Sequence, residues 1–355
     1  MRMLRTVFYK VGKEHQDQMA QLAGELAQEG VICRQCGMQQ LEKIFLYGNP
    51  GHQESGWQKH ILVLTDDISL SQCAAAHGIA CIGVGGSSQK AALEEQPPLG
   101  RAERRQEAGQ QLCSRAEASF FEGAGLVVLD LEGLDLQFLE AYLLRVLGLP
   151  VTIARTRRLI LRDITPEDLD TLYRISCQEG MQYAVLGENG ENCFEPERMA
   201  AYIQHQYRLY GYGLWSVVLA EDCEEPGQDE YVDECEAYGP VIGCCGFALP
   251  EKLLGGARPL VLKLDLGGGR DSRNTEPLFC LEMEYMLDEA YRGQGLGIDM
   301  CQAAIAYARD SLAADRLLVQ VHPANLRALA FAQRLGFLPA APDPFWHTGA
   351  CPVLI

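Results

Sequence analysis

The sequence predicts an α/β fold class in two domains, and two observations carry this prediction. In residues 1–150, short apolar runs alternate with helix-like runs, which indicates a parallel, Rossmann-like sheet. In residues 151–355, a strand-like run at 280–287 leads into a turn with three glycines and then into an amphipathic run at 298–312. At 355 residues the chain is long enough for two cores, and we place the boundary near Gly148 to Pro150.

In the first domain, Gly30 is expected to end the first helix. Asp66 and Asp67 follow a buried strand, where they either cap the next helix or form a ligand site at the strand's carboxyl end; we favour capping. The apolar runs predict strands or extended pieces at 4–9, 31–33, 43–47, 60–65, 78–84 and 125–130, and helical spacing predicts helices at 15–28, 70–77 and 136–147.

The second domain opens with an alternating strand at 158–163. Thr165 supplies an N-cap, Pro166 the first helical position and Asp168 a carboxylate that completes the cap, so a helix follows to about residue 177. A helix from 199, a strand ending near 218 and a strand at 240–248 come next.

Two long segments separate the strands of the second domain, and their roles stay open. Residues 221–236 hold nine acidic residues and no Lys or Arg, which fits a solvated loop or a lip that attracts cations. Residues 255–277 are interpreted as a glycine-rich insertion.

Charge is distributed unevenly between the halves. The formal net charge is −18; residues 1–156 hold 14 basic and 18 acidic residues, net −4, and residues 157–355 hold 16 and 30, net −14. Because no basic stripe is present, we expect no nucleic-acid partner. An acidic second half favours a cationic partner such as an amine or a basic peptide, unless the charge serves solubility alone.

Neither a membrane span nor a metal site is predicted. No apolar run reaches the roughly 18 residues of a membrane helix, so we expect a soluble, cytoplasmic protein without membrane contact. Of the 14 cysteines, Cys33 and Cys36 have a metal-like or redox-like spacing, but no second pair accompanies them.

The glycine turn is the main candidate for a ligand site. It reads Arg292-Gly-Gln-Gly295-Leu-Gly297, and the helix after it presents unpaired N–H groups and a positive dipole end, so we expect it to bind an anion such as a pyrophosphate. The spacing matches neither a P-loop nor a Rossmann fingerprint.

The spacing of Arg292, Gly295 and Gly297 resembles the acyl-CoA signature of the GNAT superfamily of N-acetyltransferases. The Asn-led run from Asn325 to Phe337 resembles the same family, and the runs 158–169 and 199–219 resemble its ribosomal-protein N-acetyltransferase branch. The resemblance covers about residues 157–337 and implies an α+β domain with a central mixed sheet.

The resemblance also implies a binding mode for acetyl-CoA. In the family, the strand before the glycine turn splays from its neighbour, and the pantetheine arm fills the gap. The backbone near Met286 and Leu287 would then hold the arm, together with Asn325. The phosphates would be held by the charge of Arg292 and by the N–H groups of the turn, which are those of Gly293, Gln294, Gly295, Leu296 and Gly297.

The amine acceptor must lose a proton before it attacks, so a base is needed. Glu282 and Glu284 share one face of their strand and are the candidates; the resemblance favours Glu282. The aromatic residues Tyr210, Tyr212 and Trp215 either line an acceptor pocket or belong to the core.

Two positions depart from the family pattern. Ala332 stands where many members carry a tyrosine that acts as general acid, and Ala328 stands where serine is common. The short, proline-rich end after Phe337 predicts a reduced last hairpin. These departures support an alternative in which the protein is a catalytically inactive acyl-CoA sensor or scaffold.

We therefore predict an N-acyltransferase that moves an acetyl group from acetyl-CoA to a primary amine by direct attack, with no metal. The amine could belong to a protein N-terminus, a lysine or a small molecule. Residues 1–150 weakly resemble a degenerate haloacid-dehalogenase-like domain, but residues 1–56 lack its Asp-x-Asp pair. We expect a non-catalytic accessory module there, regulatory or dimerising, so a homodimer is one expected assembly.

Overall fold

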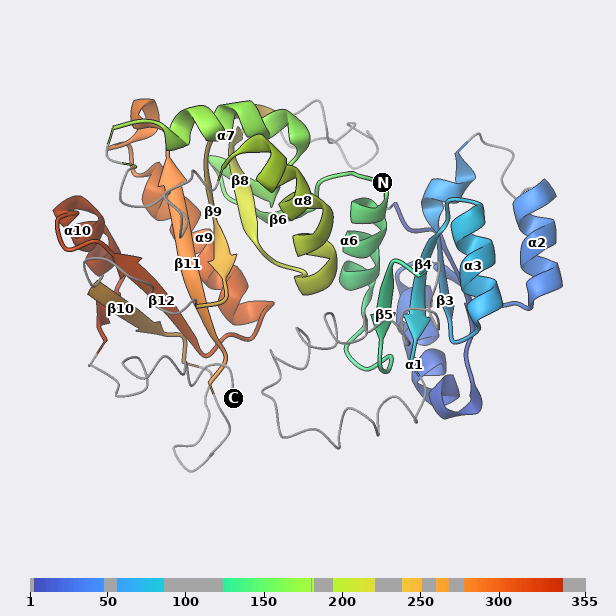
Figure 1. The fold of residues 1–355 in the computed structure, drawn as a ribbon. Coiled ribbons are helices and arrows are strands. Elements are labelled where there is room, and N and C mark those ends of the chain that lie inside the picture. Colours follow the sequence, from blue (N-terminus) through green and yellow to red (C-terminus); the bar gives the residue numbers. More distant parts are fainter. Residues whose placement is uncertain are drawn as a thin grey trace. The chain divides into compact units, whose positions relative to one another are not determined.

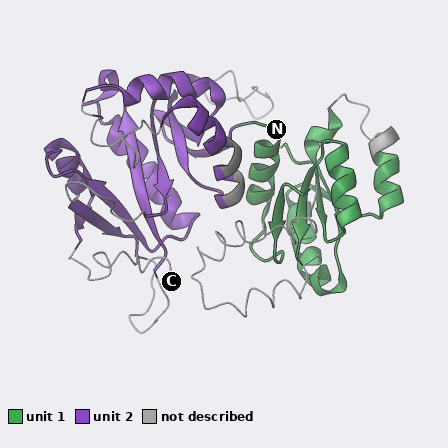
Figure 2. Cartoon of the chain, in the orientation of Figure 1, with its two compact units in different colours: residues 1–98, 105–149 green, residues 99–104, 150–355 purple. Residues whose placement is uncertain are grey.

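The computed structural model describes residues 3–47, 56–85, 124–179, 181, 194–220, 238–250, 260–267 and 278–340. The described residues up to 149 form one compact unit, and those from 150 onward form a second (Figure 2). Each unit is built on its own sheet, of five strands in unit 1 and eight strands in unit 2.

The sheet of unit 1 is parallel, as predicted, and its strand order is β2-β1-β3-β4-β5, the flavodoxin-like order. Strands β3, β4 and β5 are labelled in Figure 1. Because side chains alternate along a strand, β1 and β3 feed two clusters. One contains residues of α1 and α6, and the other contains residues of α2 and α3. The elements are β1 (Thr6–Lys10), α1 (Gln16–Gln28), β2 (Ile32–Gln35), α2 (Met38–Tyr47), β3 (Ile61–Thr65), α3 (Ile68–Ala76), β4 (Ala80–Val84), β5 (Leu126–Val128) and α6 (Leu136–Val146).

One predicted strand of unit 1 is wrong. Residues 43–47 form the end of helix α2 rather than an extended piece. Their apolar run is strand-like by itself, but Met38, Leu41 and Ile44 recur every three residues and pack into one cluster, with Leu41 fully buried. The helical spacing of the apolar residues over 38–44 therefore determines the structure, and the short apolar run at 43–47 does not form a strand.

The sheet of unit 2 is mixed, with the order β13-β10-β12-β11-β9-β8-β7-β6. Its neighbours are antiparallel except β11 and β12, which are parallel. The strands are β6 (Thr152–Arg155), β7 (Leu159–Asp163), β8 (Leu214–Ala220), β9 (Tyr238–Ala248), β10 (Leu260–Asp265), β11 (Cys280–Leu287), β12 (Arg316–Val321) and β13 (Leu338–Pro339), and the helices are α7 (Leu169–Ser176), α8 (Pro196–Tyr210), α9 (Leu296–Asp310) and α10 (Leu326–Arg334).

Strand β10 corrects the interpretation of residues 255–277 as an insertion. The run 260–265 buries Leu262 and pairs with both β12 and β13, so it is part of the sheet. The rest of that segment, and the acidic segment 221–236, lie outside the described residues. The last strand, β13, has two residues.

The two faces of this sheet are covered by different helices (Figure 1). Leu281 and Met283 of β11 pack in a cluster with Leu296 and Met300 of α9. Met286 packs in another cluster, with residues of α7 and α8. Residues 282, 284 and 286 therefore share the face of α7 and α8, which we call the α7/α8 face.

Candidate active site

The sheet of unit 2 splits between β11 and β12. These strands pair only over Cys280–Glu282 and Arg316–Leu318, whereas β11 pairs with β9 as far as Leu287. Within the described residues, the β11 edge over 283–287 thus faces no strand, and at roughly 3.3 Å per residue this edge is about 16 Å long. Met286 and Leu287 lie in it. An open edge of this kind offers backbone groups to an extended ligand.

The glycine turn stands at the end of β11. Gly293 and Gly295 have φ angles of 77° and 80°, which favour glycine, and Gly295 is the N-cap of the 15-residue helix α9. Among the residues that the structure describes, the backbone N–H groups of Gly293, Gln294, Gly295, Leu296 and Gly297 have no acceptor. Five such donors at a helix N-terminus are suited to an anion.

Arg158, which directly precedes β7, holds this turn in place. Arg158 donates from Nη1 to the Gln294 carbonyl at 2.9 Å and from Nε to the Asp299 carboxylate at 2.8 Å. Asp299 belongs to the first turn of α9. Sequence reasoning missed both residues, because nothing local links them.

A second brace comes from the end of α7. Gln178 donates to the Asp288 carboxylate at 3.1 Å and accepts from the Glu289 N–H at 2.9 Å. Arg174 also pairs with Asp288, at 3.1 Å. Burial alone would raise the pKa of Asp288, but the hydrogen bonds from Ala290, Gln178 and Arg174 outweigh it and hold the pKa below its ordinary value.

Three predicted cofactor residues have structural contacts of their own. Arg292 donates from Nε to the Leu287 carbonyl at 2.9 Å and from Nη2 to Gln178 at 3.2 Å, so it also fixes the turn. The side chain of Leu296 is buried in the core, so a ligand at the turn would contact this residue through its backbone N–H. At Gly297 a Cβ would lie 3.3 Å from the ring of Phe331 in α10, so glycine permits this helix contact.

Asn325 caps α10, its Oδ1 accepting from the Ala328 N–H at 3.1 Å. Further along this helix, Ala332 is fully buried in the core. The position that carries a tyrosine in the pattern it resembles is therefore occupied by a core side chain here. His322, which follows the end of β12, accepts the Ala324 N–H through Nδ1 at 3.2 Å.

The two predicted carboxylates are placed differently although they share the α7/α8 face. Glu282 is half-buried at the vertex of the split, where its Oε2 accepts from Gln320 Nε2 at 3.0 Å. Glu284 is exposed and lies near Tyr202 of α8. Burial raises the pKa of Tyr202, the Leu214 N–H bonded to its oxygen opposes that shift, and the charge of Glu284 adds to it.

The three aromatic residues differ in their burial. Trp215 is fully buried and stacks edge-on against Phe247 and Tyr307, with ring centroids 5.6 and 5.3 Å away. Its position on β8 points it to the α9 face, where it belongs to the core cluster, and the pocket role stays an untested prediction. Tyr212 is also buried, while Tyr210 is half-buried.

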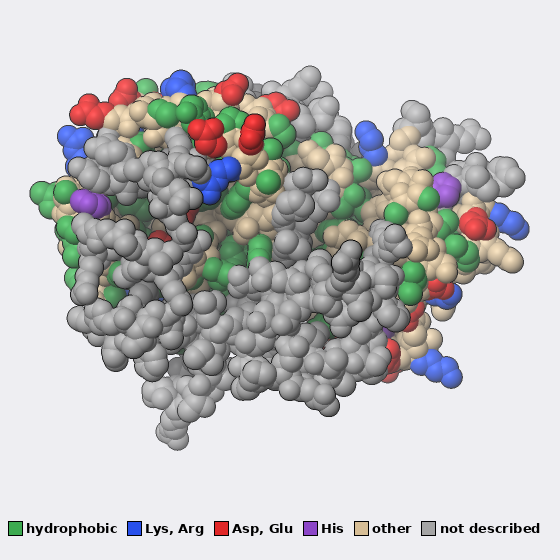
Figure 3. Space-filling model, viewed as in Figure 1, with side chains coloured by type: hydrophobic (Ala, Val, Ile, Leu, Met, Phe, Trp, Pro, Cys, Tyr) green, Lys and Arg blue, Asp and Glu red, His purple; other side chains and the backbone are tan. Residues whose placement is uncertain are grey.

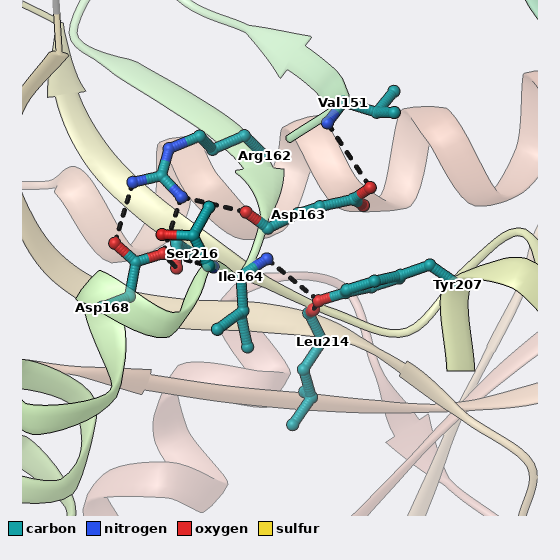
Figure 4. A network of polar contacts seen from close by, with 9 residues as sticks. Val151, Arg162, Asp163, Ile164, Asp168, Tyr207, Leu214 and Ser216 are labelled. Atoms are coloured by element: carbon teal, nitrogen blue, oxygen red, sulfur yellow. Dashed lines mark hydrogen bonds and ion pairs between the residues drawn. The ribbon is translucent and has the colours of Figure 1, made fainter. Parts of the chain in front are cut away.

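A buried polar network anchors the start of α7 (Figure 4). Arg162 binds Asp168 through both guanidinium ends, at 2.6 and 2.8 Å, and Ser216 donates to the same carboxylate at 2.7 Å. Thr165 and Asp168 form the predicted capping box. Burial would raise the pKa of Asp168, but Arg162, the Thr165 N–H and Ser216 hold it below its ordinary value. The Tyr207 hydroxyl accepts a hydrogen bond from the Ile164 N–H and donates one to the Leu214 carbonyl.

Unit 1 uses its conspicuous polar residues internally. Asp67 caps α3, as predicted, and pairs with Lys10, while Asp66 accepts from the Gly12 N–H. Cys33 and Cys36 are free thiols, and burial raises the pKa of Cys36 to about 11. Among the described residues no three or more His, Cys, Asp or Glu side chains are grouped for a metal ion, and no helix has the length and apolar character to cross a bilayer.

Acidic and basic side chains are intermixed over the described residues on the face drawn in Figure 3. The predicted absence of nucleic-acid partners stays a prediction.

Comparison with known proteins gives a family match. The model of the acetyltransferase (GNAT) domain matches residues 158–338. Similar solved structures include an acetyltransferase from Agrobacterium tumefaciens, which is 19% identical, covers 54% of this chain and 88% of its own, and has a TM-score of 0.33.

Two further structures have TM-scores of 0.34. The ribosomal-protein-S5-alanine acetyltransferase from Vibrio fischeri is 15% identical and covers 52% of this chain and 81% of its own. RimJ from Mycobacterium smegmatis in complex with CoA-disulfide is 13% identical, and the match covers 52% of this chain and 71% of its own. Among curated proteins no match was found.

Proposed function

Because the chain belongs to the GNAT acetyltransferase family, we propose that it transfers an acetyl group from acetyl-CoA to a primary amine. The observation that carries the proposal is the combination of an open β11 edge with five N–H groups at its end that have no acceptor among the described residues. The sensor alternative is not favoured by family membership, and the absence of a tyrosine at Ala332 remains its support.

In this proposal the turn from Gly293 to Gly297 binds the pyrophosphate through its N–H groups, with the remaining donors of Arg292 nearby. The pantetheine arm lies along Met286 and Leu287, and Asn325 contacts it with its amide nitrogen. These groups orient the thioester and need no metal ion.

The chemistry is a direct attack. The amine nitrogen forms a bond to the thioester carbonyl carbon as the carbon–sulfur bond breaks, and CoA leaves as the thiolate. The amine proton passes to Glu282, with Glu284 as a second acidic group that attracts a cationic acceptor. Tyr210 and Tyr212 contact the acceptor in this proposal. The acceptor is a primary amine.

The test compares Gly293→Asp with Gly293→Asn. Both residues tolerate a positive φ angle better than most, and a Cβ at Gly293 meets no atom within 4 Å, so the two variants differ mainly in charge. Calorimetric titration of the parent with acetyl-CoA is expected to give micromolar affinity, about −8 kcal/mol.

A carboxylate among the N–H donors should weaken acetyl-CoA binding at least about tenfold more than the neutral amide does. Equal affinities would refute the placement of the phosphates. Thiol release in the presence of a primary amine then separates an enzyme from a sensor, which would bind acetyl-CoA without releasing CoA.

A further inference from the structure

Gln320 lies on β12 just beyond the point where that strand parts from β11. The last residue pair of the two strands is Glu282 with Leu318, and on its other edge Gln320 pairs with Val261 of β10. Its side chain reaches back to Glu282, with 3.0 Å between Nε2 and Oε2. The hydrogen bond therefore spans the vertex of the split.

This vertex is the end of the open edge that lies opposite the glycine turn. If the phosphates bind at the turn, an arm laid along residues 283–287 has its thioester end directed toward Glu282. The inference thus rests on the proposed function, and it places the contact between Glu282 and Gln320 at the reacting end of the ligand.

We propose that Gln320 is a positioning residue, which holds the Glu282 carboxylate in place to accept the proton of the attacking amine. The amide donates to Oε2, fixes the side chain's rotamer and favours the charged carboxylate. During the transfer the proton moves from the amine nitrogen to a carboxylate oxygen, while Gln320 stays neutral.

Other charged groups lie on the same face, but they have partners elsewhere. Lys263 of β10 and Arg316 of β12 both bind Asp265. Glu284 lies two residues along β11, near Tyr202 of α8. The amide of Gln320 is neutral, so it donates to the Glu282 carboxylate without forming an ion pair.

The test uses Gln320→Leu, which removes the donor, and Gln320→Glu, which adds a like charge. Gln302→Leu, at an exposed position of α9, is the control. We expect Gln320→Leu to lower kcat roughly tenfold with the KM for acetyl-CoA nearly unchanged. In Gln320→Glu the acid limb of the pH–rate profile should move up by about one pH unit.

A double-mutant cycle separates positioning from a structural role. In the Glu282→Gln background, Gln320→Leu should have no further effect on kcat, because there is no carboxylate left to position. A loss of the same size in both backgrounds would overturn the inference.

Carbon-13 NMR titration of the Glu282 carboxyl supplies a readout that needs no turnover. Its pKa should be higher in Gln320→Leu than in the parent, and an equal pKa would also overturn the inference. A protein that fails to bind acetyl-CoA would instead refute the proposed function, while this titration would still decide whether Gln320 stabilises the carboxylate.

Discussion

The sheets of the two units differ at the edges where α/β proteins bind ligands. In unit 1 the polar groups beyond β1 and β3 bind one another: Lys10 pairs with Asp67, and the Gly12 N–H donates to Asp66. In unit 2 the strands β11 and β12 separate, and the N–H groups of the turn after β11 have no acceptor within the described residues. Open strand ends alone do not make a site; unsatisfied groups are needed as well.

The same contrast holds for the ion pairs. Arg162 and Asp168 of unit 2 are buried, with side chains 8% and 4% exposed, whereas Lys10 and Asp67 of unit 1 are 43% and 26% exposed. Desolvation makes a buried charge costly when its partner is lost, while solvent replaces the partner of an exposed one. The two pairs should therefore differ greatly in their effect on stability.

The largest expected effect is that of Arg162→Leu. It leaves the Asp168 carboxylate buried without its bidentate partner, which should lower the free energy of unfolding of unit 2 by about 3–5 kcal/mol. Hydrogen exchange of β7 and α7 during denaturant titration measures it. Arg309→Leu, which breaks an exposed pair with Asp310, is the control and should change little. A similar loss in both variants would contradict the contrast.

Local signals explain what the sequence could predict. The cap at Asp67, the capping box of Thr165 and Asp168, and the glycines at 293 and 295 each depend on a few neighbouring residues, and these features were confirmed. Such signals fix the ends of helices and the conformation of turns because their hydrogen bonds close within one turn.

The missed features depend on distant pairs. Arg158 reaches Asp299 across 141 positions, and Gln178 reaches Asp288 across 110. Likewise β10 is a strand because β12 and β13 flank it. No periodicity within one segment contains this information.

The next largest expected effect is that acetyl-CoA stabilises unit 2 and leaves unit 1 unchanged. Acetyl-CoA at one hundred times its Kd is expected to stabilise unit 2 by about 2.7 kcal/mol, since it binds the native state. Hydrogen exchange should slow in β11, α9 and α10 and stay unchanged in β1, β3 and α3 of unit 1. Equal protection of β3 and β11 would show that the ligand stabilises both units.

Removing one helix cap from each unit should lower stability by a smaller amount, similar in the two units. Asn325→Ala and Asp135→Ala each remove a side-chain cap, from α10 in unit 2 and α6 in unit 1, and each should cost about 1 kcal/mol. Asn325→Asp retains an acceptor for the Ala328 N–H but loses the amide donor. It should keep the stability and weaken acetyl-CoA binding; unchanged affinity would remove Asn325 from the ligand site.

The smallest effect concerns Lys10 and Asp67. The hydrogen bond from Lys10 is the main reason why the pKa of Asp67 lies below its ordinary value, so the charged carboxylate stabilises the folded state. That contribution is present above the unfolded pKa of about 3.9 and is lost as the pH falls through the folded pKa.

Because the pair is exposed, Lys10→Met should lower stability near neutral pH by about 0–1 kcal/mol, and the difference from the parent should shrink as Asp67 is protonated. Hydrogen exchange of β1 and α3 at several pH values measures it. A difference that grows on acidification would mean that Lys10 stabilises unit 1 through its apolar stem, independently of the charge on Asp67.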